Sequence, residues 1–191
     1  LSRLRTDRID LIQIHSASME VLEKGETLEA MREARRAGKV LHIGMTGGVA
    51  ECVKAVELGG YETVQVPYNL LALGAEERLL PLAREKGIGV ILMRGIAGGK
   101  LSEKYVHIKD EKLRNAVADL VPFTGPGQPA RDLVHLAMGY VLAEPAVSTV
   151  IVGSRRLDAV RSNLIAAEQP LPKEFVDRLR KHLHAATTQT W

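Results

Sequence analysis

Short apolar segments alternate along the chain with longer amphipathic ones, and this alternation constrains the fold more than any other feature. Five segments rich in Ile, Val and Leu are typical of β-strands; they are residues 9–14, 40–45, 63–66, 90–93 and 148–152. Apolar residues at helical spacing follow each of them, in residues 23–37, 49–58, 76–85, 110–143 (two helices with a break at 122–129), 157–167 and 173–185. Strands that alternate with helices indicate an α/β fold with parallel strands. Their nearly continuous apolar character predicts burial on both faces.

Two folds with parallel strands fit this order of elements: a doubly wound sheet and part of a (βα)8 barrel. A dinucleotide-binding doubly wound sheet is expected to carry Gly-x-Gly-x-x-Gly after a strand, whereas the nearest run here, which starts at Gly95, has a different spacing. In a barrel, the residues that follow the strands build the active site. Polar residues or glycines follow all five predicted strands: His15-Ser16, Thr46-Gly47-Gly48, Tyr68-Asn69, Arg94-Gly95 and Gly153-Ser154-Arg155-Arg156. These strand ends favour the barrel.

Five longer motifs include these strands and occur in a fixed order: residues 4–15 (ending Asp10-Leu11-Ile12-Gln13-Ile14-His15), 38–46, 64–71, 87–101 and 147–163. In order and spacing they resemble the aldo-keto reductase family, from its fourth barrel strand to its eighth. The resemblance implies one domain over residues 1–191, the C-terminal portion of that barrel. We therefore expect a partial TIM-type (βα) barrel of five parallel strands with flanking helices. Because five strands cannot close a barrel as a monomer, we also expect a homodimer or higher homo-oligomer.

The resemblance implies descent from NADP(H)-dependent oxidoreductases that act on small aldehydes and ketones. It assigns to His15 the role of the family's catalytic histidine, which hydrogen-bonds the substrate carbonyl, and a neutral imidazole is a suitable donor near neutral pH. No residues match the family's catalytic Tyr, Lys and Asp, which are three of its four tetrad residues. We therefore expect activity to be weak or lost. The alternative is a non-catalytic half-barrel scaffold or interaction module.

Three residues are predicted, from the resemblance, to surround the nicotinamide of the cofactor. Gln65 matches the family's glutamine on the sixth strand, and a carboxamide needs such a partner because it has both a donor and an acceptor. Thr46-Gly47 stands where the family has Ser-Asn, so a side-chain amide contact is missing at Gly47. Met93 stands where many members stack an aromatic ring, and its thioether packs on a ring less rigidly.

Two further segments are predicted, from the resemblance, to hold the phosphates and the adenosine. In the loop after the fourth strand here, glycines let backbone N–H groups approach the pyrophosphate and cations add charge. The segment before the last barrel helix combines a hydroxyl with two guanidinium groups, which suits a 2′-phosphate and favours NADP(H). The family's frequent Lys is Gly153 here and its later Arg is Ala159, so Arg155 or Arg156 would substitute. The predicted contacts are Arg94, Gly95, Gly98, Gly153, Ser154, Arg155, Arg156 and the adenine-binding Asn163.

Composition excludes several other classes of function. Lys and Arg total 26 against 23 Asp and Glu, and this small, dispersed excess does not indicate a nucleic-acid surface. The single cysteine, Cys52, cannot form an intrachain disulfide and fits a reducing, cytoplasmic compartment. No apolar run reaches the ~20 residues of a membrane span. The histidines show no metal-ligand spacing with Cys or carboxylates, so no metal site is predicted.

Overall fold

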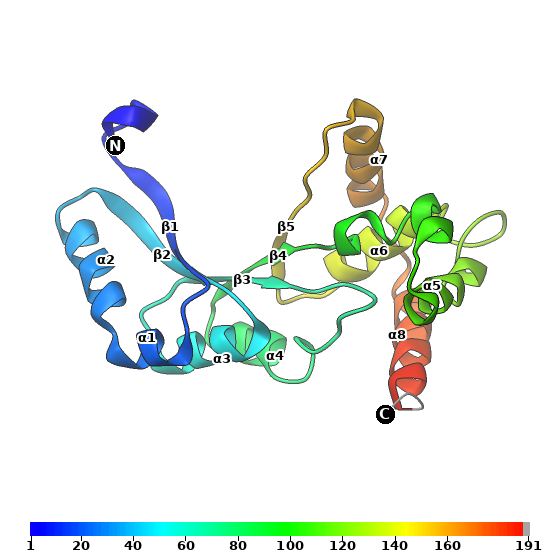
Figure 1. Cartoon of the computed structure of the whole chain (residues 1–191), viewed down its shortest axis with the longest axis horizontal. Coiled ribbons are helices and arrows are strands. Elements are labelled where there is room, and N and C mark those ends of the chain that lie inside the picture. The colour runs from blue at the N-terminus through cyan, green and yellow to red at the C-terminus, as the bar shows by residue number, and fades with distance from the viewer. Residues whose placement is uncertain (189–191) are drawn as a thin grey trace. The chain divides into compact units, whose positions relative to one another are not determined.

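The computed structural model describes residues 1–188, and they divide into two compact units (Figure 1). The first unit contains Leu1–Pro67 and Gly74–Met93, and the second contains Tyr68–Leu73 and the chain from Arg94 onward. The single domain expected from the sequence stays a prediction.

Four parallel strands form the sheet of the first unit. They are β1 (Ile9–His15), β2 (Val40–Thr46), β3 (Thr63–Pro67) and β4 (Gly89–Met93), and they pair in that order. Each observed strand exceeds the predicted one by a single residue. These strands were predicted correctly because each is an apolar run bounded by glycines or polar residues, and both features can be seen in the local sequence.

Four helices accompany this sheet: α1 (Met19–Lys24), α2 (Glu26–Arg36), α3 (Val49–Leu58) and α4 (Leu79–Glu85). The prediction of one continuous helix over residues 23–37 was wrong, because Gly25 adopts a left-handed φ of 71° that ends α1 and precedes α2. Helix α1 starts earlier than expected, since the Ser18 side chain accepts a hydrogen bond from the backbone N–H of Val21 at 3.3 Å.

One face of the sheet is buried more deeply than the other. Helices α2, α3 and α4 contact the strands, and the side chains of Ile43, Met45, Val64, Val66, Val90 and Leu92 are fully buried. Along β3 and β4 buried residues alternate with partly exposed ones. The prediction of strands buried on both faces was therefore wrong within this unit, because its helices cover only one face.

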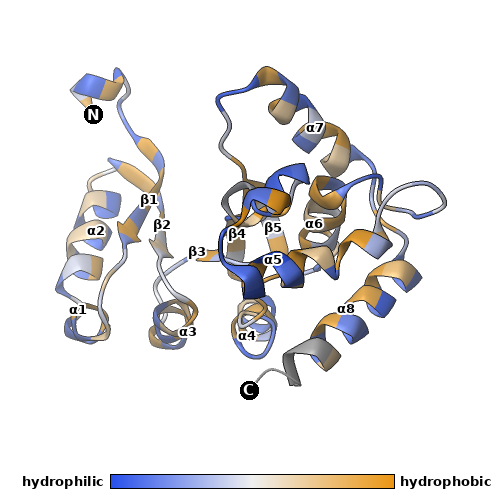
Figure 2. Cartoon of the chain, turned by 45° about the vertical axis from the view of Figure 1, so that its right-hand side comes forward, coloured by the Kyte–Doolittle hydropathy of each residue, from blue (hydrophilic) through white to orange (hydrophobic). Residues whose placement is uncertain are grey.

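The second unit contains β5 (Val147–Ile151) and four helices: α5 (Glu111–Ala118), α6 (Leu133–Leu142), α7 (Leu157–Glu168) and α8 (Lys173–Thr188). Helix α6 is apolar on nearly all sides and is buried along its length, while Asp132 caps it by accepting from the His135 N–H at 2.8 Å. Helix α8 is amphipathic, with Phe175, Val176, Leu179 and Leu183 buried (Figure 2). The predicted break between the two central helices is confirmed.

Gly139 explains how closely α6 packs in this unit. A Cβ added there would lie 2.5 Å from Leu171 Cγ and 2.7 Å from Leu171 Cδ1. Only glycine allows the buried Leu171 side chain to fill this space. Among the described residues, none of the helices has the length and apolarity needed to cross a bilayer.

Candidate functional site

The carboxyl ends of β1, β2 and β3 bring three of the predicted site residues into one row. His15 is the register partner of Thr46, and Thr46 is the register partner of Gln65. Register partners in a parallel sheet project to the same face, so these side chains share the face that the helices leave uncovered. His15 is exposed, Thr46 is buried and Gln65 is half-buried. The row therefore presents an imidazole, a hydroxyl and an amide side by side.

Gln65 is held in place by contacts at both its backbone and its side chain. Its carbonyl oxygen accepts hydrogen bonds from the Gly47 N–H at 3.1 Å and from the Cys52 thiol at 3.7 Å. Its side-chain Nε2 donates to Met93 Sδ at 3.7 Å. A thioether is a weak acceptor, so the contact positions the amide without satisfying it. Gln65 and Met93 are thus brought together as a pair.

Cys52 contributes packing and no nucleophile. Its side chain is fully buried in α3, and desolvation raises the pKa of its thiol to about 12. A thiol needs to ionise before it reacts. It is therefore inert at neutral pH.

In the second unit, the segment after Arg94 forms a tight loop with an unusual backbone. Arg94, Ala97, Gly98 and Gly99 all have positive φ, at 59°, 50°, 67° and 88°. The N–H groups of Ala97 and Gly99 donate within the loop, to the carbonyls of Arg94 (2.7 Å) and Ile96 (2.9 Å). Left-handed conformations in non-glycine residues are strained and gather at functional sites. The loop is therefore preorganised, with some of its N–H groups already used internally.

Asn69, Gly95 and Ser102 fix the shape of this loop. Asn69 is buried, donates to the Arg94 carbonyl at 3.0 Å and accepts from the Leu71 N–H at 2.9 Å, so it acts as a turn residue. Gly95 packs closely, because an added Cβ would lie 3.0 Å from Val150 Cγ1. The Ser102 hydroxyl donates to the Gly99 carbonyl at 2.7 Å.

A side chain of the segment between β5 and α7 stabilises the turn that this segment makes. Ser154 Oγ accepts from the Arg156 N–H at 3.1 Å, a local turn that precedes the helix. Arg156 then occupies the N-cap of α7, and its own side chain makes no capping hydrogen bond. The first turn of α7 thus begins directly after this segment.

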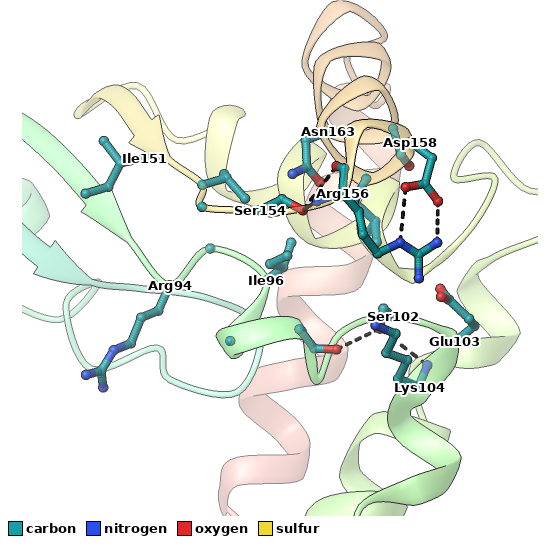
Figure 3. A pocket seen from close by; sticks show the side chains of 18 residues that line it. Arg94, Ile96, Ser102, Glu103, Lys104, Ile151, Ser154, Arg156, Asp158 and Asn163 are labelled. Carbon is teal, nitrogen blue, oxygen red and sulfur yellow. Dashed lines mark hydrogen bonds and ion pairs between the residues drawn. The ribbon is translucent and has the colours of Figure 1, made fainter.

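These two segments border a pocket of about 530 Å³ in the second unit (Figure 3). In Figure 3, Ser154, Arg156, Asp158 and Asn163 lie on one side, and Ser102, Glu103 and Lys104 lie on the other. Seven of the eight residues predicted for the phosphates and adenosine line it: Arg94, Gly95, Gly98, Gly153, Ser154, Arg156 and Asn163. Arg155 is exposed and is not among the lining residues.

The pocket also contains charged residues that the sequence analysis missed: Glu103, Lys104 and Asp158. Arg156 Nε donates to Asp158 Oδ1 at 3.1 Å, and Arg156 Nη2 donates to Asp158 Oδ2. The hydrogen bond from Arg156 lowers the pKa of Asp158 to about 2, and the same bond raises the pKa of Arg156. Asp158 could have been found from the sequence, because an acidic residue in the first turn of a predicted helix is a recognisable pattern. Glu103 and Lys104 could not, because they are far from α7 in the sequence.

The predicted site therefore divides between the two units. His15, Thr46, Gln65 and Met93 belong to the first, and the pocket residues belong to the second. Within residues 1–188, no cluster of three or more His, Cys, Asp or Glu side chains is arranged to hold a metal ion.

Comparison with known proteins identifies relatives along nearly the whole chain. The family model described as "Aldo/keto reductase family" matches residues 1–184. The oxidoreductases YqkF and YrpG of Bacillus subtilis, both uncharacterised, are 29% and 30% identical over 95% and 94% of this chain. The holo structure of aldo-keto reductase AKR11C1 from Bacillus halodurans superimposes with a TM-score of 0.79 at 28% identity, covering 94% of this chain. The chain spans 62%, 60% and 62% of the lengths of these three proteins.

Proposed function

Because the chain belongs to the aldo/keto reductase family, we propose that it binds a nicotinamide dinucleotide and derives from an NAD(P)H-dependent carbonyl oxidoreductase. One observation supports this proposal above all others. Residues predicted from two separate segments, together with Asn163 of α7, line one pocket in the second unit. Its volume of about 530 Å³ suits the adenosine and phosphate part of a dinucleotide.

The chemistry of the lining residues fits this part of the cofactor. Lys104 offers positive charge to the pocket, and Arg156 is a second lining cation whose guanidinium is already paired with Asp158. Gly98 and Gly99 carry no side chains that would block approach, and their positive φ values favour glycine at both positions. We propose that the pyrophosphate lies against this loop and that Asn163 contacts the adenine.

The first unit, taken by itself, carries residues suited to a nicotinamide group. Gln65 would hydrogen-bond the carboxamide, Thr46 would lie beside it, and Met93 would pack against the ring. When bound, the nicotinamide supplies a hydride to a carbonyl carbon. His15, in the same row as Gln65, would donate a hydrogen bond to the carbonyl oxygen and orient it.

We further propose that catalysis by this chain alone is weak. The family's Tyr, Lys and Asp find no match in the sequence, and a general acid commonly contributes ~10²–10⁴ in rate. This agrees with an interpretation of the chain as a five-stranded partial barrel that corresponds to the later strands of the family fold. A small aldehyde or ketone would be the substrate.

Self-association and a cytoplasmic location complete the proposal. Among the described residues, β1 pairs only with β2, so its other edge offers unpaired backbone groups. On α7, Leu157 and Leu164 expose 65% and 58% of their surfaces, and apolar residues at this spacing form one stripe of a helix. A homodimer would cover such surfaces. A free, buried thiol at Cys52 suits a reducing compartment.

A titration tests the proposed function. NADH and NADPH are each added to the purified chain while their fluorescence is followed, with Lys104→Ala as the pocket variant and Lys109→Ala as the control on the exposed surface outside the pocket. We expect saturable micromolar binding of at least one dinucleotide, weakened about tenfold by K104A and unchanged by K109A. Failure of both dinucleotides to bind at millimolar concentration would refute the proposal and favour a scaffold or interaction module.

A further inference from the structure

We propose that the ion pair between Arg156 and Asp158 makes the pocket select NAD(H), whose adenosine ribose has a free 2′-hydroxyl, over NADP(H), which has a 2′-phosphate. This inference rests on the proposed function, because it concerns which dinucleotide the pocket takes. The sequence favoured NADP(H) through Arg155 and Arg156. In the structure, Arg155 does not line the pocket and Arg156 already has an anionic partner.

The guanidinium of Arg156 is engaged at two points. Its Nε donates to Asp158 Oδ1 at 3.1 Å, and its Nη2 donates to Asp158 Oδ2 (Figure 3). Arginine binds phosphate through the same planar fork that it uses for a carboxylate. A 2′-phosphate that approached Arg156 would therefore have to displace the Asp158 carboxylate or share the guanidinium with it.

Asp158 also occupies the other anchor that an anion would use. It lies in the first turn of α7, and the N–H groups of Ala159 and of Asp158 itself interact with its carboxylate and stabilise its charge. Helix N-termini bind phosphates through such N–H groups. The Asp158 carboxylate thus occupies both positions that a phosphate would use, the Arg156 guanidinium and the N-terminus of α7.

A second carboxylate reinforces this preference. Glu103 lines the same pocket, and its charge acts on Arg156. Arg94 does not offset it, because its side chain extends away from Ser154, Arg156 and Asn163 (Figure 3). Lys104 also lines the pocket, but one further cation balances only one of the two carboxylates. A 2′-phosphate brings a charge of about −2 at neutral pH toward two carboxylates. A ribose hydroxyl instead donates a hydrogen bond to a carboxylate, as acidic residues do in NAD sites of other folds.

Asp158 keeps its charge wherever the protein would be assayed. The hydrogen bond from Arg156 holds the pKa of its carboxyl at about 2. The selection therefore persists from neutral to mildly acidic pH.

The test compares dissociation constants of NADH and NADPH for the wild type, Asp158→Asn and the control Asp177→Asn. Asp177 is also an ion-paired aspartate: it is half-exposed, binds Lys173 at 2.5 Å and lies on α8 outside the pocket. We expect the wild type to bind NADH at least about fivefold more tightly than NADPH. D158N should tighten NADPH binding about tenfold and weaken NADH binding modestly, because the ribose hydroxyl then loses a carboxylate acceptor. D177N should match the wild type. Glu103→Gln should shift the ratio in the same direction by a smaller factor.

The other possible results separate failure of this inference from failure of the proposed function. If the wild type binds NADPH more tightly than NADH, or if D158N and E103Q leave the ratio unchanged, the inference is overturned while the proposed function stands. If D158N weakens NADPH binding, Asp158 positions Arg156 for phosphate and the inference is again overturned. If the wild type binds neither dinucleotide, the proposed function fails and the inference fails with it.

Discussion

The side-chain Nε2 of Gln65 on β3 donates to Met93 Sδ on β4 at 3.7 Å. This contact joins the polar row at the strand ends to β4 within the first unit. The pair also offers a clear test of the proposed nicotinamide contacts, because Gln65 would bind the carboxamide and Met93 would pack against the ring.

Gln65→Ala should weaken NADH binding about tenfold, the loss of one or two hydrogen bonds to the carboxamide. ADP-ribose lacks the nicotinamide, so its affinity should stay unchanged. Isothermal titration calorimetry with both ligands measures the two effects. An equal loss for NADH and ADP-ribose would show that Gln65 acts on the fold and not on the nicotinamide.

Gly139→Ala should destabilise the protein by about 1 kcal/mol. The gain in helix propensity, about 1 kcal/mol, opposes an overpacking cost of about 1–3 kcal/mol, because the new Cβ would lie 2.5 Å from Leu171 Cγ. Urea unfolding gives the free energy difference. Gly74→Ala is the control, since nothing lies within 4 Å of its Cβ position. Equal stability of G139A and the wild type would contradict the close packing of α6 on Leu171.

Cys52 should resist alkylation by iodoacetamide in the native protein at mildly alkaline pH and react fully in denaturant. Burial raises the pKa of its thiol from 9.0 to about 12, so the native protein holds this proton in the range where the unfolded chain releases it. Stability should therefore decline as the pH rises above 9.0, since ionisation then favours the unfolded state. Mass spectrometry counts the label. Rapid native labelling would show that α3 opens readily.

Light scattering should give a mass of at least twice 20.9 kDa at micromolar concentration, because β1 offers an unpaired edge and α7 an exposed apolar stripe. Leu164→Lys would place a charge in that stripe and should reduce the mass toward that of the monomer. A well-folded wild-type monomer would remove the proposal of self-association.

Local signals predicted most of the fold. The boundaries of the strands were predicted to within one residue, because apolar runs and the glycines or polar residues that bound them can be seen in the local sequence. The break at Gly25 was missed, since the apolar spacing continues across it and only the left-handed φ shows that one helix ends there. Alternating burial on β3 and β4 was also missed, because it depends on which face the helices cover.

The candidate site was predictable where residues follow strands and unpredictable where tertiary packing selects them. Seven of the eight predicted phosphate and adenosine contacts line the pocket. Arg155 and Arg156 are adjacent in sequence, and only the turn through Ser154 decides which of them faces the pocket. Glu103 reaches the site through the loop fold after Gly99, which no local pattern reveals.

Amide chemical shifts measured by NMR during titration with ADP-ribose test the central claim most directly, because they locate the ligand as well as detect it. The proposed site predicts saturable shifts at Gly98, Gly153, Ser154 and Asn163, with the amides of α1 and α2 unmoved. Shifts centred elsewhere, or none at millimolar ligand, would contradict a dinucleotide site in this pocket.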